Sequence, residues 1–255
     1  MLNITTSARK IKIIPLGDLH IGSPSCNIDT VSRWVDTIRL SDDTYCILLG
    51  DLIDAALANN KNDVYTATMN PGKSIQYVAS ILEPIKDKII AAVDGNHEAR
   101  ICRAVSVSPT QLLMQSLGIP AAYCPTVARI SVTLGYGMDD AGITFKIYGT
   151  HGNGCGHLAG SKLNALAKLG DIDDADVFFA GHTHLPAMFK LGHVVTDPVT
   201  GVETIAPRLF VNIGAALDYF GSYGETAGFP PSVIMMPVVE LGIGTNGKKQ
   251  IKGYI

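Results

Sequence analysis

Five short segments of the sequence contain side chains that can bind metal ions and transfer protons. In chain order they are Asp18-Leu19-His20, Gly50-Asp51-Leu52-Ile53-Asp54, Gly95-Asn96-His97-Glu98, His151-Gly152 and Gly181-His182-Thr183-His184. Mixed carboxylate, amide and imidazole ligands suit Mn²⁺, Fe or Zn²⁺ better than Ca²⁺, which prefers oxygen ligands. The candidate ligands are too many for one tetrahedral zinc ion and suit two ions that share a carboxylate. Such a pair of ions is an arrangement that hydrolyses phosphate esters.

Each of these segments follows an apolar stretch that predicts a β-strand. The five predicted strands cover residues 10–16, 44–49, 88–93, 143–149 and 176–180. Ligand sites collect at the carboxyl ends of strands in α/β sheets, so the five segments are expected to meet in one cleft. In an extended segment residues i and i+2 project the same way, so Asp18 and His20 are expected to reach one point, as are His182 and His184. We expect the glycines before these residues to permit the sharp turns; they are Gly17, Gly50, Gly95 and Gly181.

The remaining pattern predicts a single α/β domain over residues 1–255. Apolar residues at helical spacing predict helices at 29–40, capped by Asn27 or Asp29, at 73–86, at 97–106, at 109–117 and at about 160–169. Further strands are expected at 127–134, 186–195, 204–213, 232–241 and 248–254. Strands and helices that alternate early, followed mainly by strands, favour two sheets packed face to face with helices outside.

Composition excludes several classes of protein. The 255 residues are 47% hydrophobic and 17% charged, which is incompatible with a disordered chain. The formal net charge of −3 does not indicate a broad basic face for long nucleic acids. Five cysteines without a C-x-x-C pair do not predict a disulfide framework. With no predicted signal peptide or membrane span, we expect a cytoplasmic protein without a membrane partner.

The ordered set D-x-H, G-D-x-x-D, G-N-H-E, H-G and G-H-T-H resembles the calcineurin-like metallophosphoesterase superfamily. The motifs run from Asp18 to His184, which is most of the chain. The resemblance implies an α/β fold that is a four-layer αββα sandwich of two mixed β-sheets flanked by helices. It also implies two divalent metal ions, for which we expect Mn²⁺, with Fe, Zn²⁺ and Ni²⁺ as alternatives.

The resemblance further implies a role for each motif residue. Asp51 would bridge the two ions. The coordination of the first ion would be completed by Asp18, His20 and His184. The coordination of the second ion would be completed by Asn96, His151 and His182. A hydroxide between the ions would attack phosphorus, His97 would protonate the leaving oxygen, and Asp54 would orient His97.

Three further residues are candidates for substrate binding. Arg100 follows G-N-H-E and either binds a phosphate or forms an ordinary surface ion pair. His157 lies in a glycine-rich loop, where contact with substrate, replacement of His151 as a ligand and exposure to solvent are all open. Tyr219 lies in the aromatic loop 214–231, which either stacks a base, covers the core or forms a dimer contact.

Departures from subfamilies narrow the predicted activity. The Ser/Thr protein phosphatases carry Arg-Gly after G-D-x-x-D, where this chain has Ala55-Ala56. G-H-T-H instead resembles the phosphodiesterase and nuclease branches. The first hypothesis is therefore a phosphodiesterase that acts on small or nucleotide-like substrates. A nuclease resembling the double-strand-break repair nucleases is the second hypothesis, and a non-catalytic scaffold on the same fold is the third.

Overall fold

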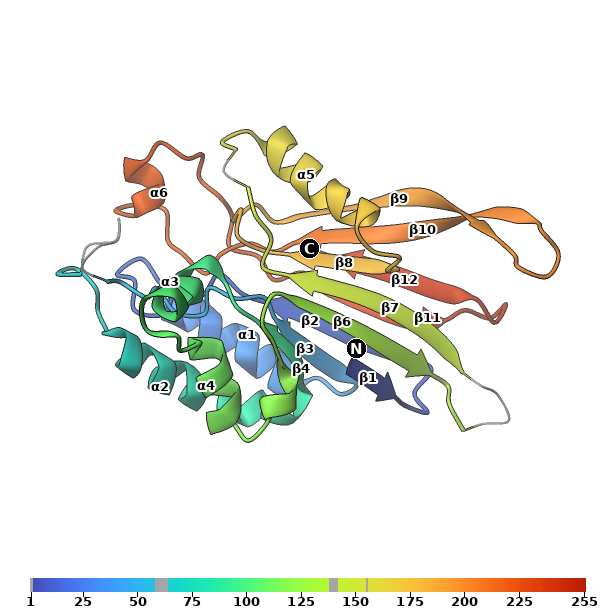
Figure 1. Cartoon of the computed structure of the whole chain (residues 1–255), viewed down its shortest axis with the longest axis horizontal. Coiled ribbons are helices and arrows are strands. Elements are labelled where there is room, and N and C mark those ends of the chain that lie inside the picture. Colours follow the sequence, from blue (N-terminus) through green and yellow to red (C-terminus); the bar gives the residue numbers. More distant parts are fainter. Residues whose placement is uncertain (1, 58–63, 138–141, 155) are drawn as a thin grey trace.

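The computed structural model describes residues 2–57, 64–137, 142–154 and 156–255, and its framework is two six-stranded mixed β-sheets (Figure 1). The first sheet has the spatial order β12 (Lys249–Tyr254), β11 (Val238–Ile243), β2 (Lys10–Leu16), β3 (Thr44–Leu48), β4 (Ile89–Val93) and β5 (Tyr123–Cys124). The second has the order β1 (Leu2–Thr5), β6 (Val127–Leu134), β7 (Ile143–Thr150), β8 (Val177–Ala180), β10 (Glu203–Asn212) and β9 (Ala187–Thr196). Within each sheet, the strands that lead to the predicted site residues pair in parallel: β2 with β3 and β3 with β4 in the first, and β7 with β8 in the second.

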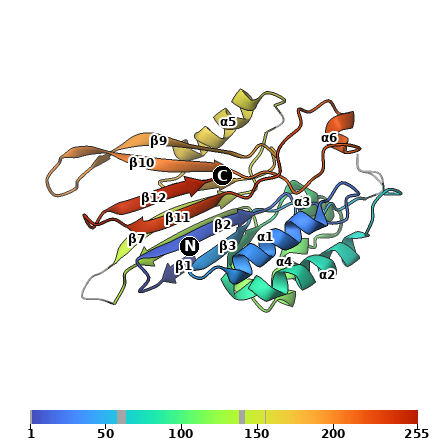
Figure 2. The ribbon, with the colours of Figure 1, turned by 180° about the vertical axis from the view of Figure 1, so that it is seen from behind.

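Helices cover the outer faces of both sheets. The first sheet is covered by α1 (Ile28–Leu40), α2 (Pro71–Leu82), α3 (Asn96–Val105) and α4 (Pro109–Ser116) (Figure 2). The second is covered by α5 (Ala159–Ala167), and the short α6 (Tyr223–Thr226) lies in the connection after β10. The described residues also include the 3₁₀ helices η1 (Glu83–Lys88), η2 (Pro120–Ala122) and η3 (Lys168–Asp171). The predicted α/β sandwich is confirmed.

Three apolar layers hold these elements together because the central strands are buried on both faces. Alternate residues of a strand point to opposite faces. In β8, Val177 and Phe179 therefore pack between the two sheets, while Phe178 packs against α5. In β3, Ile47 packs between the sheets and Leu48 packs beneath the helices. Runs of consecutive apolar residues are typical of such strands.

Most predicted elements are present, and proline explains two boundaries that were wrong. The helix predicted over 73–86 ends at Leu82 and continues as η1, because Pro84 has no N–H and its ring clashes with the preceding turn. The strand predicted over 232–241 begins only at Val238, directly after Pro237, because proline cannot donate to a sheet. Asn27 caps α1 by accepting a hydrogen bond from the backbone N–H of Thr30.

The sequence patterns missed two short strands. β1 lies in the polar N-terminal segment and pairs with β6 in the second sheet, and β5 has only two residues. Four cysteines in the described part of the chain have free thiols, and Cys155 lies outside it. None of the helices described is long and apolar enough to cross a lipid bilayer.

Candidate metal centre

The structure brings all seven predicted metal ligands to one place, where the carboxyl ends of five strands meet. These ends belong to β2, β3 and β4 of the first sheet and β7 and β8 of the second. In Figure 1 the arrowheads of β7 and β10 point to the side of the molecule where α6 lies. The five motifs therefore meet across the ends of both sheets.

The first group of potential ligands contains Asp18, His20 and His184. Their ligand atoms all lie within 4.8 Å of one another. His20 Nε2 is 3.2 Å from His184 Nε2, and His184 Nε2 is 3.5 Å from Asp18 Oδ1. Nitrogen atoms that face each other and a carboxylate oxygen are arranged as ligands of a single cation.

The second group contains Asp51, His151 and His182, whose ligand atoms also lie within 4.8 Å of one another. Asn96 adds an amide oxygen, which is 2.9 Å from His151 Nε2 and 2.7 Å from His182 Nδ1. Asp51 lies between the groups, since its Oδ2 is 3.4 Å from His151 Nε2 and 3.9 Å from His20 Nε2.

The donor atoms fit divalent cations. Asp18 Oδ1 is buried and accepts no hydrogen bond within the described structure, an arrangement that costs free energy unless a cation pairs with it. The hydrogen-bond network assigns a ring N–H of His151 to the carbonyl of Leu49 at 2.7 Å and a ring N–H of His182 to that of Gly154 at 2.9 Å. Each imidazole therefore turns its other nitrogen toward the group, where that nitrogen can bind a cation once it is deprotonated.

Histidine–carboxylate pairs keep the carboxylates ionised. Burial opposes the charge of Asp18, but the attraction of the nearby His184 ring, whose Nε2 lies 3.5 Å from Asp18 Oδ1, outweighs it and lowers the pKa of the Asp18 carboxyl. The same balance lowers the pKa of Asp51, where His151 supplies the hydrogen bond and charge. Burial alone would lower the pKa of His151, yet Asp51 raises it to about 9.

The backbone of the ligand loops differs from the expected extended form. The ligands that follow β2, β3 and β8 adopt left-handed backbone conformations: Asp18, His20 and Asp51 have φ of 49°, His182 has 67° and His184 has 54°. Asp18 and His20 do reach one point, but His182 and His184 point into different groups. The expectation that Asp18 and His20 meet is therefore correct, but left-handed backbone and not strand alternation brings them together. For His182 and His184 the expectation is wrong.

Glycine at two of the motif positions is needed for different reasons. Gly50 has φ of 80°, a conformation that permits the expected turn. Gly95 is extended, and its requirement is close approach: a Cβ there would lie 2.1 Å from Asp51 Oδ1. The loops after β3 and β4 therefore touch backbone to backbone.

Glu98 lies in the first turn of α3, where its negative charge interacts favourably with the helix dipole, but it also holds the backbone of the neighbouring loop. Its buried carboxylate accepts hydrogen bonds from the backbone N–H groups of Asp51 at 2.9 Å, Leu52 at 2.8 Å, Ile53 at 3.2 Å and Gly95 at 2.9 Å. Burial and the charge of Asp51 raise the pKa of Glu98 to about 7. Glu98 thus fixes the loop of Asp51 against the start of α3.

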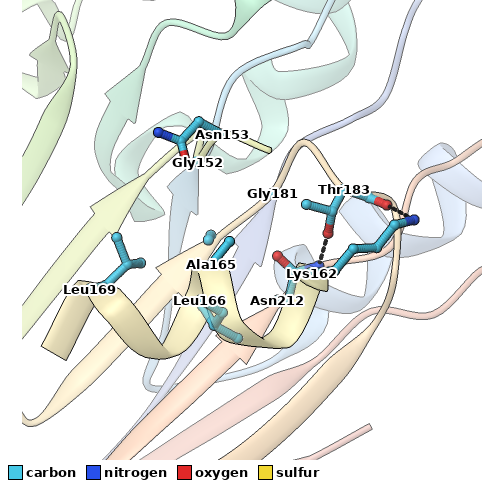
Figure 3. Close-up of a pocket in the computed structure, with 10 residues that line it drawn as sticks. Gly152, Asn153, Lys162, Ala165, Leu166, Leu169, Gly181, Thr183 and Asn212 are labelled. Carbon is cyan, nitrogen blue, oxygen red and sulfur yellow. Dashed lines mark hydrogen bonds between the residues drawn. The ribbon is translucent and has the colours of Figure 1, made fainter. Parts of the chain in front are cut away.

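Sequence reasoning missed Asn212 and Lys162, which hold the turn of His182 and His184. Asn212, the buried last residue of β10, donates to Thr183 Oγ1 at 2.7 Å and to the Leu185 carbonyl at 2.6 Å. Lys162 of α5 donates to the Thr183 carbonyl at 2.8 Å. Figure 3 shows both contacts at the edge of a shallow pocket between α5 and the strand ends. No local motif marks these residues, because they act across the fold.

The predicted catalytic pair lies beside the first group. His97 Nδ1 donates to the backbone carbonyl of Asp54 at 2.5 Å, and the Asp54 carboxylate lies 3.6 Å from the same nitrogen and 3.7 Å from His20 Nδ1. Arg100 places its guanidinium 3.0 Å from His97 Nε2. Burial, followed by the charges of His20 and Arg100, lowers the pKa of His97 to about 4.

The other predicted substrate-binding residues lie in neighbouring loops. The ring of His157 stacks on Phe229, and Tyr219 donates its hydroxyl hydrogen to the Phe229 carbonyl at 2.9 Å. His151, and not His157, lies with the ligand atoms of the second group.

The fold, the motifs and the clustered metal-binding side chains together define a metallophosphoesterase. A sequence profile of the calcineurin-like phosphoesterases matches residues 11–186. The chain belongs to the calcineurin-like phosphoesterase family, which confirms the resemblance seen in the five motifs and makes it a metal-dependent phosphoesterase.

Comparison with solved structures gives matches that align with nearly the whole chain. Vps29 of Entamoeba histolytica complexed with Zn²⁺ is 14% identical, with a TM-score of 0.45, and the match covers 96% of this chain and 98% of that one. A predicted phosphoesterase from Streptococcus pneumoniae is 15% identical, with a TM-score of 0.38 and coverages of 96% and 98%. A metallophosphoesterase from Sphaerobacter thermophilus is 13% identical, with a TM-score of 0.40 and coverages of 96% and 87%. Among curated proteins, none matches this sequence.

Cation affinity should rise with pH. The raised pKa of His151 means that the cation-free protein holds a proton on this ring below about pH 9, and a cation must displace it. Calorimetric titration with Mn²⁺ should give an affinity that rises about tenfold per pH unit between about pH 6.5 and 8.5. The control His193→Ala, in β9, should keep this slope. An affinity that does not change with pH would contradict the coupling.

Replacing Asn212 by Ala should weaken cation binding more than it weakens the fold. The change removes the donor of two hydrogen bonds that hold the turn, and losses of such outer partners reduce metal affinity by about 10- to 100-fold. Mn²⁺ affinity and thermal unfolding should both be measured. The control Ile130→Ala destabilises the buried layer between the sheets and should leave affinity unchanged. Equal affinity losses in the two variants would show that Asn212 supports only the fold.

Proposed function

We propose that the centre binds two divalent cations, Mn²⁺ in the first instance, and hydrolyses phosphodiesters. One cation would be held by Asp18, His20 and His184, and the other by Asn96, His151 and His182, with Asp51 shared between them. The observation that carries this proposal is the convergence of these side chains in adjoining groups at the strand ends, one of which contains the buried Asp18 oxygen that accepts no hydrogen bond within the described structure. Cations in such a site lower the pKa of water toward neutrality and offset charge on phosphoryl oxygens.

The protein's own residues position the phosphate and assist the leaving group. Arg100 is the guanidinium nearest His97 and is placed to bind a non-bridging phosphoryl oxygen. His97 uses Nδ1 on the Asp54 carbonyl, so Nε2 is the nitrogen that faces the centre, 3.7 Å from Asp51 Oδ2. A bound phosphate anion favours the protonated imidazole because the negative charge raises its pKa. His97 then donates the Nε2 proton to the departing oxygen, and Asp54 keeps the ring in place.

The partly exposed ligands indicate how the substrate enters. Asn96, His182 and His184 are half-buried, whereas Asp18, His20, Asp51 and His151 are buried. The substrate therefore approaches from the side of α3 and the 182–184 turn. A nuclease activity is the second outcome of the same assay, although the net charge of −3 does not favour a long polyanion.

Asp51→Asn should abolish most of the hydrolysis of bis(4-nitrophenyl) phosphate in Mn²⁺. The change removes the charge shared between the two groups of ligands, and we expect rates to fall by about 100-fold or more. Wild-type enzyme after chelation should be inactive and should recover when Mn²⁺ is restored.

The substrate panel should add 4-nitrophenyl phosphate and single- and double-stranded DNA. Asp197→Asn, in the β9–β10 connection, is a matched control and should keep full activity. Hydrolysis of monoesters alone would overturn the diester assignment, and hydrolysis of DNA in preference to small diesters would favour the nuclease.

His97→Ala should affect substrates according to their leaving groups. A general acid contributes about 10²- to 10⁴-fold when the departing alkoxide needs a proton, and much less for 4-nitrophenolate, which is stable without one. We therefore expect a large loss for a dialkyl diester such as a dinucleoside phosphate and a smaller loss for bis(4-nitrophenyl) phosphate. Equal losses for both substrates would assign His97 to phosphate binding instead.

A further inference from the structure

Two connecting segments, one between β7 and α5 and the other between β10 and β11, approach the 182–184 turn and carry aromatic rings. Gly154 lies between β7 and α5, and its carbonyl accepts the hydrogen bond of His182 Nε2 at 2.9 Å. Ser232 lies between β10 and β11, and its hydroxyl donates to the His184 carbonyl at 2.5 Å. Both segments are thus fixed to the residues that line the open side of the metal centre.

The rings of these segments form a cluster, which we name the aromatic platform and define as His157, Tyr223 and Phe229. The rings of His157 and Phe229 are parallel within 5°, with centroids 4.4 Å apart. The Tyr223 ring lies 6.4 Å from that of Phe229, and Lys162 Nζ lies 5.9 Å from the Phe229 centroid. The hydrogen bond from Tyr219 to the Phe229 carbonyl fixes the backbone of this platform.

Two of the three platform residues, His157 and Tyr223, are exposed, and Phe229 is half-buried. Tyr223 is 60% exposed, the neighbouring Phe220 is 85% exposed, and His157 is exposed as well. Exposed aromatic surface next to a polar site is a feature of binding sites. Packing of the loop alone would be served by buried rings, whereas His157, which stacks on the half-buried Phe229, and Tyr223 leave ring surface open to solvent.

The platform lies within reach of a group attached to a phosphate in the centre. His157 follows Gly154 by three residues, and Phe229 precedes Ser232 by three, and three residues span at most about 10 Å. The Cα atoms of His157 and Phe229 are therefore about 10 Å or less from those of Gly154 and Ser232, the residues that bond to His182 and His184. Lys162 adds a positive charge between the platform and the turn, because it also donates to the Thr183 carbonyl.

We propose that the aromatic platform binds the base of a nucleoside attached to the scissile phosphate, so that the substrates are nucleotide diesters. This inference rests on the proposed phosphodiesterase function. Every base presents a flat π-face, and stacking on aromatic side chains tolerates all of them. The net charge of −3 favours such a small substrate over a long polyanion.

Two substrates with the same leaving group test the platform. They are the 4-nitrophenyl ester of thymidine 5′-phosphate and ethyl 4-nitrophenyl phosphate, which lacks a base. Wild-type enzyme should prefer the thymidine ester about tenfold or more in kcat/KM, and His157→Ala and Phe229→Leu should each reduce this preference about tenfold. Tyr136→Ala, an exposed aromatic in the turn after β6, is the matched control and should retain the preference.

The possible failures are distinguishable. If the wild-type enzyme hydrolyses both esters equally, or if the variants keep the preference, the platform does not bind the base, while the phosphodiesterase function stands. If neither ester reacts with Mn²⁺, the proposed function fails. Binding then decides the inference: saturation-transfer NMR should show contact between the protein and the base protons of AMP, lost in Phe229→Leu. No transfer to these protons in the wild-type protein would overturn the platform independently of catalysis.

Discussion

The structure depends on buried carboxylates that bond to the backbone of neighbouring loops. Asp18 accepts from the His182 N–H and Asp51 from the His97 N–H, each at 2.8 Å and each with one oxygen, while their other oxygens face the histidines. Both carboxylate oxygens of Glu98 accept hydrogen bonds from backbone N–H groups. Buried charges are costly unless they are paired, so the loops must take the positions that supply these donors. The carboxylates thereby join the end of β2 to that of β8, and the end of β3 to that of β4.

The same contacts explain how much of the site could be predicted. Residue type and position at strand ends predicted which side chains meet, because parallel strands end at one edge of a sheet. The left-handed backbone at Asp18 and His184 could not be predicted, because it is costly locally and persists through hydrogen bonds made across the fold. The roles of Asn212 and Lys162 could not be predicted for a related reason, because their partner Thr183 is distant in sequence.

Long apolar runs and apolar stripes at helical spacing were sufficient to predict most strands and helices of the fold. β8 and α1 were predicted because burial on two faces, or on one helical face, leaves a clear pattern. β1 could not be recognised, because its residues alternate between half-buried and exposed and its partner β6 lies more than 120 residues away. The C-terminal end of α2 and the start of β11 are set by Pro84 and Pro237, because proline has no backbone N–H to donate to a helix or a sheet.

The position of β2 has a consequence for how the chain acquires its structure. β2 pairs with β3 on one side and with β11 on the other, and the register joins Ile13 to Val239. This pairing closes a loop of more than 200 residues, and such non-local contacts slow folding because chain entropy is lost before the contact forms. The strand that leads to Asp18 therefore lacks one of its neighbours until β11, more than 200 residues later in the sequence, has left the ribosome. Until then, one edge of β2 is open to other strands, and this is the stage at which the chain is most exposed to mispairing and aggregation.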